Sequence, residues 1–241
     1  MKPFLTTAFF IVLTMYFNAC SSTKSAQDSK SITNESTATT IFTNPSEQQV
    51  IINTTLGDIT IKLYNETPLH RDAFIANVKD GTYNELLFHR VIKGFMIQGG
   101  DPLSRNAKPD QMLGMGSKHT PPQRIPAEFN ANLIHKKGAL CAARDNNPEK
   151  ASSDCQFYIV QGKIANDNEL TQMETRNDIK YTEEQRTVYK TIGGTPFLDN
   201  NYTVYGEVVK GLEVLDAIAN TPTKSGDRPV TDVKFSMKLI D

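Results

Sequence analysis

The sequence predicts a mainly β protein, a barrel or a sandwich, with few helices. Many short segments rich in β-branched and aromatic residues are separated by Gly, Pro and Asn turns. Apolar residues recur at helical spacing in only a few segments. No internal repeat is present, which argues against a solenoid or a propeller.

The composition excludes several classes of protein. The chain has 241 residues, of which 38% are hydrophobic and 22% are charged, which excludes a collagen-like chain, a long coiled coil and a fully disordered chain. The formal net charge is −1, so no excess of basic residues exists to neutralise phosphates, and we expect no nucleic-acid partner. Three cysteines are too few for a disulfide scaffold.

The segment 1–19 has the pattern of a secretory signal peptide. Lys2 precedes a mostly apolar stretch that is too short to span a bilayer, and the small residue Ala19 precedes Cys20. The sequence around Cys20 resembles the lipobox of bacterial lipoproteins, in which the cysteine is lipidated and becomes the mature N-terminus. This resemblance implies a lipid-anchored protein of the bacterial cell envelope, facing the periplasm or the exterior. The alternative is a cleaved signal in which Cys20 has no role.

Residues 20–47 are predicted to be a flexible tether that carries the lipid at Cys20. About half of the residues from 21 to 47 are Ser or Thr, and few are apolar. Such a segment cannot bury enough apolar surface to offset the entropy lost on ordering. We therefore place the folded domain at 48–241.

The domain is expected to begin with a β-hairpin and a helix. Residues 50–55 are β-branched, and residues 59–63, beyond a turn signal, alternate apolar and polar side chains. Thr67 and Pro68 suit the N-cap and the first position of a helix, and Gly81 suits its end.

The rest of the domain is predicted to be mostly strands. Strands are expected at 139–143, 156–160, 203–209 and 233–239, with a helix over 212–219.

Residues 163–194 differ from the segments around them because they are mostly polar. Thr182 and Gln185 form a capping-box pattern, and two glycines end the run, so the second half is predicted to be a helix. The apolar positions are too few for a separate core. We therefore interpret this segment as a surface insertion rather than a second domain.

The run from Phe88 to Asp101 reads FHRVIKGFMIQGGD. It closely resembles the signature of the cyclophilin family of peptidyl-prolyl isomerases. Four later segments resemble stretches of the same family in the same order, namely 138–143, 152–159, 195–199 and 202–208. The resemblance extends from about Val50 to the end of the chain, apart from 163–194. It implies a closed antiparallel β-barrel with two capping helices, to which this chain adds a helical surface insertion.

The spacing of these residues agrees with a binding face. Alternate residues of a strand share a face, so Arg90 and Ile92 project one way, and Gln156 and Tyr158 share a face while Phe157 points to the core. One face of the sheet then carries a cation, amide and phenol groups and apolar walls. Such a face suits a proline ring held beside a polar backbone.

Isomerisation of a prolyl bond requires only rotation about the amide C–N bond. The barrier is about 18–20 kcal/mol because the amide C–N bond has partial double-bond character. Twisting this bond makes the proline nitrogen pyramidal and more basic, so a cation aimed at that nitrogen stabilises the twisted state most. By resemblance, Arg90 is this catalytic cation, and no nucleophile, metal or cofactor is required.

The resemblance also implies roles for the residues around Arg90. Gln98 and Gln156 would hold Arg90 and the substrate backbone. The proline pocket would be formed by Phe95, Met96, Tyr158 and Leu198.

The remaining site residues include departures from the family pattern. The backbone of Ala143 and Arg144 would pair with the substrate as an added strand, and Phe197 and Tyr202 would line the rim. Phe197 stands where Trp is common in eukaryotic members, Tyr202 where His is common, and Arg144 where Asn is usual. Because an indole donor is lost at Phe197, we expect weak binding of cyclosporin.

Other reactive residues have plainer interpretations. His70, His119 and His135 show no metal-ligand spacing with Cys or acidic residues, so no metal site is expected. Cys141 and Cys155 lie on candidate neighbouring strands, and they form either a disulfide or two buried free thiols.

The sequence as a whole predicts a monomeric prolyl isomerase that acts on proline-containing polypeptides outside the cytoplasm and is bound to a membrane through its N-terminal lipid. The alternative is a proline-peptide binding module or holdase with little turnover. The insertion 163–194 could also serve as a docking helix for a specific client or partner, which is compatible with the isomerase function.

Overall fold

The computed structural model describes residues 46–240. The predicted signal peptide, Cys20 and the tether up to residue 45 lie outside the described residues. Within the described range, Glu47 forms an ion pair with Lys62 at 2.9 Å. Glu47, which the sequence placed in the tether, therefore belongs to the folded part.

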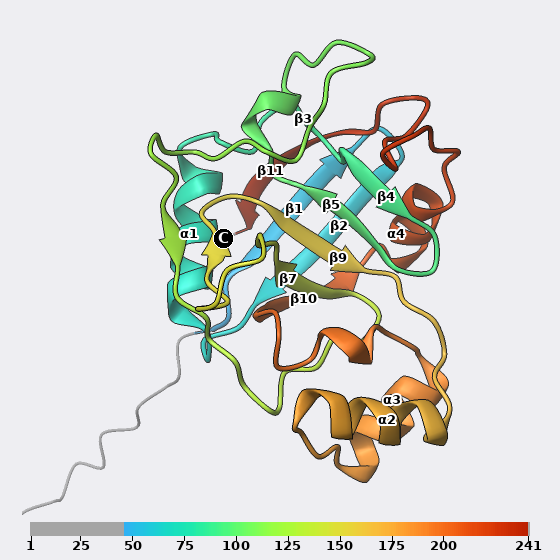
Figure 1. Ribbon diagram of the computed structural model, residues 1–241. Helices are drawn as coiled ribbons and strands as arrows, with labels where there is room; N and C mark the ends of the chain where they lie inside the picture. The colour runs from blue at the N-terminus through green and yellow to red at the C-terminus, as the bar shows by residue number, and fades with distance from the viewer. Residues whose placement is uncertain (1–45, 241) are drawn as a thin grey trace, which may run out of the picture. The chain divides into compact units, whose positions relative to one another are not determined.

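Alternating apolar and polar residues build one long antiparallel sheet and a small second one. The strands are β1 (Gln49–Thr54), β2 (Gly57–Leu63), β3 (Leu86–Leu87), β4 (Arg90–Ile92), β5 (Met96–Gly99), β6 (Arg124–Ile125), β7 (Ala139–Ala142), β8 (Ser152–Ser153), β9 (Phe157–Val160), β10 (Val204–Lys210) and β11 (Lys234–Ile240). Nine of them form the main sheet in the order β3-β11-β1-β2-β10-β7-β9-β5-β4, and β6 pairs with β8 (Figure 1). The predicted hairpin is confirmed as β1 and β2.

The main sheet curls into a barrel whose two edge strands are neighbours in the sequence. Only Phe88 and His89 separate β3 from β4, so the chain itself brings the two edges together. Within residues 46–240, no ladder of hydrogen bonds pairs β3 with β4. The mainly β barrel is confirmed, but its closure is made by the connecting chain and the core rather than by a continuous ladder.

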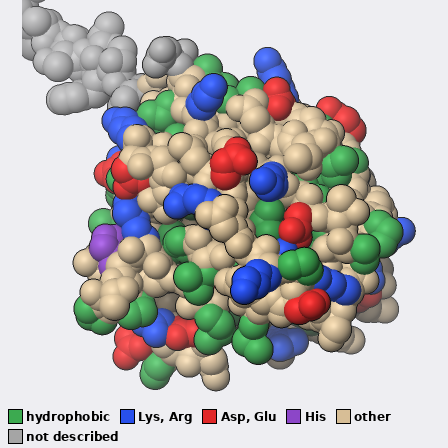
Figure 2. Space-filling view, turned by 90° about the horizontal axis from the view of Figure 1, so that it is seen from above, with side chains coloured by type: hydrophobic (Ala, Val, Ile, Leu, Met, Phe, Trp, Pro, Cys, Tyr) green, Lys and Arg blue, Asp and Glu red, His purple; other side chains and the backbone are tan. Residues whose placement is uncertain are grey.

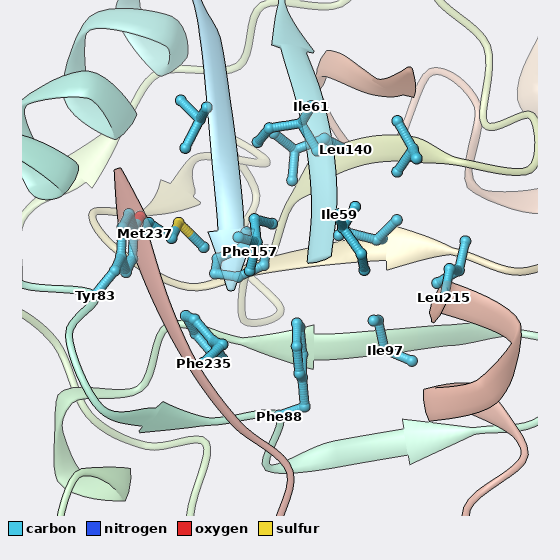
Figure 3. Close-up of a cluster of buried hydrophobic side chains, with 14 of the residues drawn as sticks. Ile59, Ile61, Tyr83, Phe88, Ile97, Leu140, Phe157, Leu215, Phe235 and Met237 are labelled. Carbon is cyan, nitrogen blue, oxygen red and sulfur yellow. The ribbon is translucent and has the colours of Figure 1, made fainter. Parts of the chain in front are cut away.

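The barrel interior is filled by large apolar side chains from nearly every strand. Phe88, Phe157 and Phe235 pack together, with ring centroids 4.7 to 6.2 Å apart in tilted and edge-on arrangements (Figure 3). Such aromatic contacts add to the free energy gained from burial alone. A second apolar cluster, which includes Met96 and Tyr158, lies on the other face of the same strands.

Two helices insert apolar side chains into the barrel core. Helix α1 (Pro68–Lys79) packs against β10 and β11, and helix α4 (Leu212–Ala219) packs against β2, β4 and β5 (Figure 1). Phe74 and Val78 from α1 and Leu215 and Ile218 from α4 belong to one core cluster. Both helices are where the sequence predicted them.

The start of α1 is capped by a distant residue rather than by Thr67. The Thr67 side chain makes no capping hydrogen bond. Instead the Glu128 carboxylate accepts hydrogen bonds from the backbone N–H groups of Leu69 and His70, at 3.0 and 2.9 Å. A carboxylate at this end of a helix also interacts favourably with the helix dipole. Glu128 lies almost 60 residues along the chain, so local sequence could not reveal it.

The insertion contains two helices, one of which the sequence analysis missed. Helix α3 (Glu183–Thr191) has the predicted capping box. Helix α2 (Asp167–Asn177) was missed because its residues are almost all polar, although Asn166 and Glu169 form a second capping box. The helices enclose a small apolar cluster, contrary to the expectation that the segment had no core. The cluster consists of Ile134, Ala165, Leu170, Tyr181 and Tyr189, and its first member comes from outside the insertion.

The two described cysteines are free and buried. Cys141 belongs to the cluster on the outer face of the sheet and Cys155 to the barrel core, so the sheet separates them and the disulfide does not form. Burial raises the pKa of the Cys155 thiol to about 12.

Residues 46–240 contain neither a membrane-spanning helix nor a cluster of metal-binding side chains. No helix of this range is both long and apolar enough to cross a membrane. No group of three or more His, Cys, Asp or Glu side chains in this range has the geometry to hold a metal ion.

Two buried histidines predict how stability depends on pH. Burial lowers the pKa of His70, and it lowers the pKa of His89 to about 4, against an unfolded value near 6.5. Between these values the unfolded chain binds protons that the folded chain does not. The free energy of unfolding should therefore fall as pH drops from 7 to 5, by up to about 1.4 kcal/mol per pH unit through His89, and His70 should contribute in the same direction.

The substitution His89→Phe isolates one of these contributions. Neither ring nitrogen of His89 has a hydrogen-bond partner among the described residues, so an apolar ring of similar size should be accepted. Urea unfolding of both proteins at several pH values measures the slopes. An equally steep decline in the variant would contradict the assignment to His89.

Candidate functional site

The register of three adjacent strands places the predicted catalytic cation beside its predicted neighbours. Arg90 on β4 lies opposite Gln98 on β5, and Gln98 lies opposite Tyr158 on β9. Residues directly opposite one another in antiparallel strands project to the same face. The alternation predicted from sequence is confirmed, because Phe157 packs in the barrel core while Tyr158 lies in the outer cluster.

A small pocket opens on this outer face. It has a volume of about 100 Å³. All but two of the site residues predicted within the described range line it, namely Arg90, Phe95, Met96, Gln98, Ala143, Arg144, Tyr158, Leu198 and Tyr202. The two that do not line it, Gln156 and Phe197, contact residues that do.

Arg90 is anchored by a residue that the sequence analysis did not identify. Its Nε atom donates a hydrogen bond to the Asp227 carboxylate at 3.2 Å, and the backbone carbonyl of Asp227 accepts from the N–H of Val91 at 2.8 Å. Within residues 46–240 no hydrogen bond reaches either Nη group of Arg90. The guanidinium is therefore fixed at one edge while its outer nitrogens can donate to a ligand.

Gln98 and Gln156 bond to each other rather than to Arg90. The Gln98 amide donates to the Gln156 side-chain oxygen at 3.2 Å. The Gln156 amide in turn donates to the backbone carbonyls of Gly114 and Gly116, at 3.0 and 2.7 Å. The prediction that the two glutamines hold Arg90 is therefore wrong. Their contacts fix the Gln98 side chain in the pocket wall. These contacts depend on the loop that contains Gly114 and Gly116, which the sequence did not connect with the site.

The backbone available to a peptide is that of Arg144. The N–H of Ala143 donates to the carbonyl of Gln156 at 3.0 Å, and the carbonyl of Ala143 accepts from Ser153 at 2.9 Å. The predicted pairing of Ala143 with a substrate strand is therefore wrong, because its donor is already used. No hydrogen bond among the described residues uses the backbone N–H or carbonyl of Arg144, so this residue can still pair with an added strand.

The Arg144 side chain forms part of the wall. Its guanidinium stacks 4.4 Å from the centre of the Tyr202 ring and donates to the carbonyls of Asn201 and Asp145, both at 2.9 Å. A guanidinium over an aromatic face is attracted by the ring quadrupole. Arg144 thus holds the Tyr202 ring in place and has little freedom to act as a second catalytic cation.

Phe197 lies at the rim, as the sequence predicted. It is 41% exposed, and its ring centre is 5.5 Å from that of Phe95. Phe197 and Leu198 belong to a short 3-10 helix, η2 (Pro196–Leu198). This turn presents one side chain to solvent and the next to the pocket.

His89, the neighbour of Arg90, contributes no charge at neutral pH. Its side chain is buried, and burial lowers its pKa to about 4. The charged pair nearest to this edge of the pocket is therefore Arg90 with Asp227, and not His89. A larger open cavity of about 660 Å³ continues from here and shares Arg90, Gln98 and Arg144 with the pocket.

The surface is otherwise mixed in character. On the face seen from above in Figure 2, basic, acidic and hydrophobic side chains are interspersed, and no single kind forms a continuous patch. The pocket is distinguished by its shape and by Arg90 rather than by a strong overall charge.

Comparisons with known proteins agree with this geometry. Residues 49–238 match the family model described as "Cyclophilin type peptidyl-prolyl cis-trans isomerase/CLD". A candidate peptidyl-prolyl cis-trans isomerase of Staphylococcus aureus strain COL is 36% identical over 188 residues, which are 78% of this chain and 88% of that protein. A similarly described protein of Staphylococcus saprophyticus is 34% identical over 200 residues, which are 82% and 94% of the two chains.

Solved structures support the fold. The crystal structure of a cyclophilin-type peptidyl-prolyl cis-trans isomerase from Cryptosporidium parvum superposes with a TM-score of 0.60 and 23% identity, covering 81% of this chain and 98% of that one. A second crystal structure of the same protein, in the presence of the dipeptide Ala-Pro, gives the same TM-score over 80% and 99%. With the family model and the close relatives, the sheet order and the pocket lead to one conclusion: this chain belongs to the cyclophilin-type peptidyl-prolyl cis-trans isomerases.

Proposed function

We propose that this isomerase acts on X-Pro bonds of polypeptides outside the cytoplasm of a bacterial cell, with Arg90 as its catalytic residue and a lipid on Cys20 as its anchor. The observation that carries the catalytic part is the position of Arg90. Its guanidinium lies beside the apolar side chains that line the pocket, and its Nε donates a hydrogen bond to Asp227.

The proposed mechanism uses only groups of this chain. The proline ring enters the pocket between Phe95, Met96 and Leu198. As the prolyl bond twists, the nitrogen lone pair is no longer delocalised into the carbonyl group, and the Nη groups of Arg90 donate hydrogen bonds to that nitrogen. This interaction is stronger in the twisted state than in either planar state, which is the condition for catalysis.

The proposed substrates are unfolded or extended chains. The backbone of Arg144 offers one donor and one acceptor, which suits a substrate in extended conformation. The C. parvum relative has been crystallised in the presence of Ala-Pro. Prolyl isomerisation without a catalyst takes tens of seconds or more, so an enzyme of this class would remove a slow folding step for proteins in the cell envelope.

The proposed lipid anchor would limit how far the domain can move from the membrane. Residues 20–47 are mostly small and polar. A flexible chain of this length has a root-mean-square extension of about 30 Å. Such a tether would let the domain sample clients close to the membrane.

Replacing Arg90 separates catalysis from binding. Arg90→Ala should lower kcat/KM for an X-Pro peptide by about 100-fold or more, as expected when a transition-state donor is lost. The Kd for the peptide should change less than threefold. NMR exchange measures the rate and a titration measures the Kd, with Arg71→Ala as control because Arg71 pairs with Asp72 away from the pocket. A wild-type protein that binds the peptide without accelerating exchange would instead establish a binding module or holdase.

The rim residue Phe197 should determine the response to cyclosporin. The wild-type chain should bind cyclosporin weakly, because Phe197 cannot donate a hydrogen bond. Phe197→Trp restores an indole donor and should tighten binding about tenfold, the effect of one added hydrogen bond. Isothermal titration of both proteins measures the change. Tight binding by the wild type would refute this account of the rim.

The lipid anchor has a direct test. In a bacterial host, the wild-type chain should fractionate with membranes, and Cys20→Ser should be released in soluble form or retained with an uncleaved signal. Mass spectrometry of the wild-type N-terminus should show acyl chains on Cys20. Wild-type protein that is soluble and begins after a different cleavage site would eliminate the anchor.

A further inference from the structure

A buried carboxylate joins the insertion to the barrel. Asp199 is only 4% exposed. Its Oδ1 atom accepts a hydrogen bond from the backbone N–H of His135 at 2.8 Å and lies 2.7 Å from Nδ1 of the same residue. Its Oδ2 atom accepts hydrogen bonds from the hydroxyls of Tyr181 and Tyr189, at 2.7 and 2.5 Å.

Both tyrosines belong to the insertion. Tyr189 lies on α3 and Tyr181 just before it, and their rings pack edge-on, 5.4 Å apart. Among the described residues these two hydroxyls are the only donors to Oδ2 of Asp199. A buried carboxylate oxygen without donors is costly. His135 holds Oδ1 of Asp199, whereas Oδ2 depends on the insertion for its hydrogen bonds.

The network continues from Asp199 to the proline pocket. Nε2 of His135 lies 3.0 Å from the hydroxyl of Tyr158, and the two rings stack with centroids 6.2 Å apart. When Nδ1 of a neutral imidazole donates to Asp199, Nε2 is an acceptor, so Tyr158 donates. Tyr158 lines the pocket. Its ring is thus oriented through His135 and Asp199 by two residues of the insertion.

A second set of contacts connects the insertion to the pocket wall. The Asn177 side chain, at the end of α2, donates to the carbonyl of Pro196 at 3.1 Å. The side chains of Asn200 and Asn201 donate to Asn177, at 3.1 and 3.2 Å. Leu198 and Tyr202, both of which line the pocket, lie within or directly after this segment.

We propose that Tyr181 and Tyr189 are positioning residues of the prolyl isomerase, and that the insertion braces the proline pocket through Asp199, His135 and Tyr158. The proposal rests on the proposed site around Arg90. The insertion then acts on the affinity of the pocket for proline, while Arg90 has a separate anchor at Asp227.

The first test removes the two hydroxyls and keeps the rings. In the full chain, Tyr181→Phe combined with Tyr189→Phe should raise KM for an X-Pro peptide at least fivefold and leave kcat within twofold. A merely structural role predicts the reverse, because partial unfolding lowers kcat per molecule and leaves KM unchanged. Either that pattern or unchanged kinetics would overturn the proposal. Tyr205→Phe is the matched control, since Tyr205 is equally buried in the barrel core, and an equal rise of KM in this control would also overturn it.

A double-mutant cycle provides a second test with milder variants. Tyr189→Phe and Tyr158→Phe should each raise KM, and the rise in the double variant should be smaller than the product of the two, because both changes break one network. Effects that multiply independently would contradict the proposed connection.

A binding measurement separates failure of the proposed catalytic function from failure of the proposed role of the insertion. If the wild-type chain does not accelerate exchange, the proposed function fails. The Kd of the same peptide then tests whether the insertion positions the proline pocket. A Kd that is at least fivefold higher in the Tyr181→Phe/Tyr189→Phe variant supports this role of the insertion, and an unchanged Kd overturns it.

Discussion

The alternation of side chains along β9 is the constraint on which the rest of the structure depends. Phe157 and Ile159 fill the barrel, while Tyr158 and Val160 belong to the outer cluster, from which Tyr158 lines the pocket. A shift of one residue in the pairing of β9 with β5 would exchange these two sets. Core packing therefore fixes the register, and the register in turn places Tyr158, Gln98 and Arg90 in one row. The stability of the barrel and the geometry of its site have the same physical origin.

The parts that the sequence revealed are those set by local patterns. Alternation and helical spacing predicted the main strands, α1, α3 and α4, and the resemblance to the cyclophilin family, carried by the motif around Arg90 and by later segments, predicted the pocket lining. What was missed depends on contacts between segments far apart in the chain. Glu128 caps α1, Asp227 anchors Arg90, and the carbonyl of Gly116 holds Gln156. No periodic pattern in the sequence marks such partners, because each contact needs only one carboxylate or carbonyl group.

The charges of the site are arranged so that one cation remains available. Burial keeps His89 neutral, stacking on Tyr202 immobilises Arg144, and only Arg90 combines a fixed position with outer nitrogens that no described residue occupies. Prolyl isomerisation involves no formal charge transfer, so a stronger field would attract acidic chains without helping the twisted state. The modest overall charge of the chain is consistent with substrates that are recognised by shape and backbone.

The sheet order carries a further consequence for how this protein is made. The first strand, β1, lies between the second strand and the last one, and β3 pairs only with β11 in the described sheet. Pairings of such high sequence separation form slowly, because a long loop must close before they contribute. The barrel cannot be completed until β11, up to Ile240, has left the ribosome. The closing strand of the sheet order is thus the last described strand to be synthesised, so the barrel assembles from its two distant ends only at that late stage.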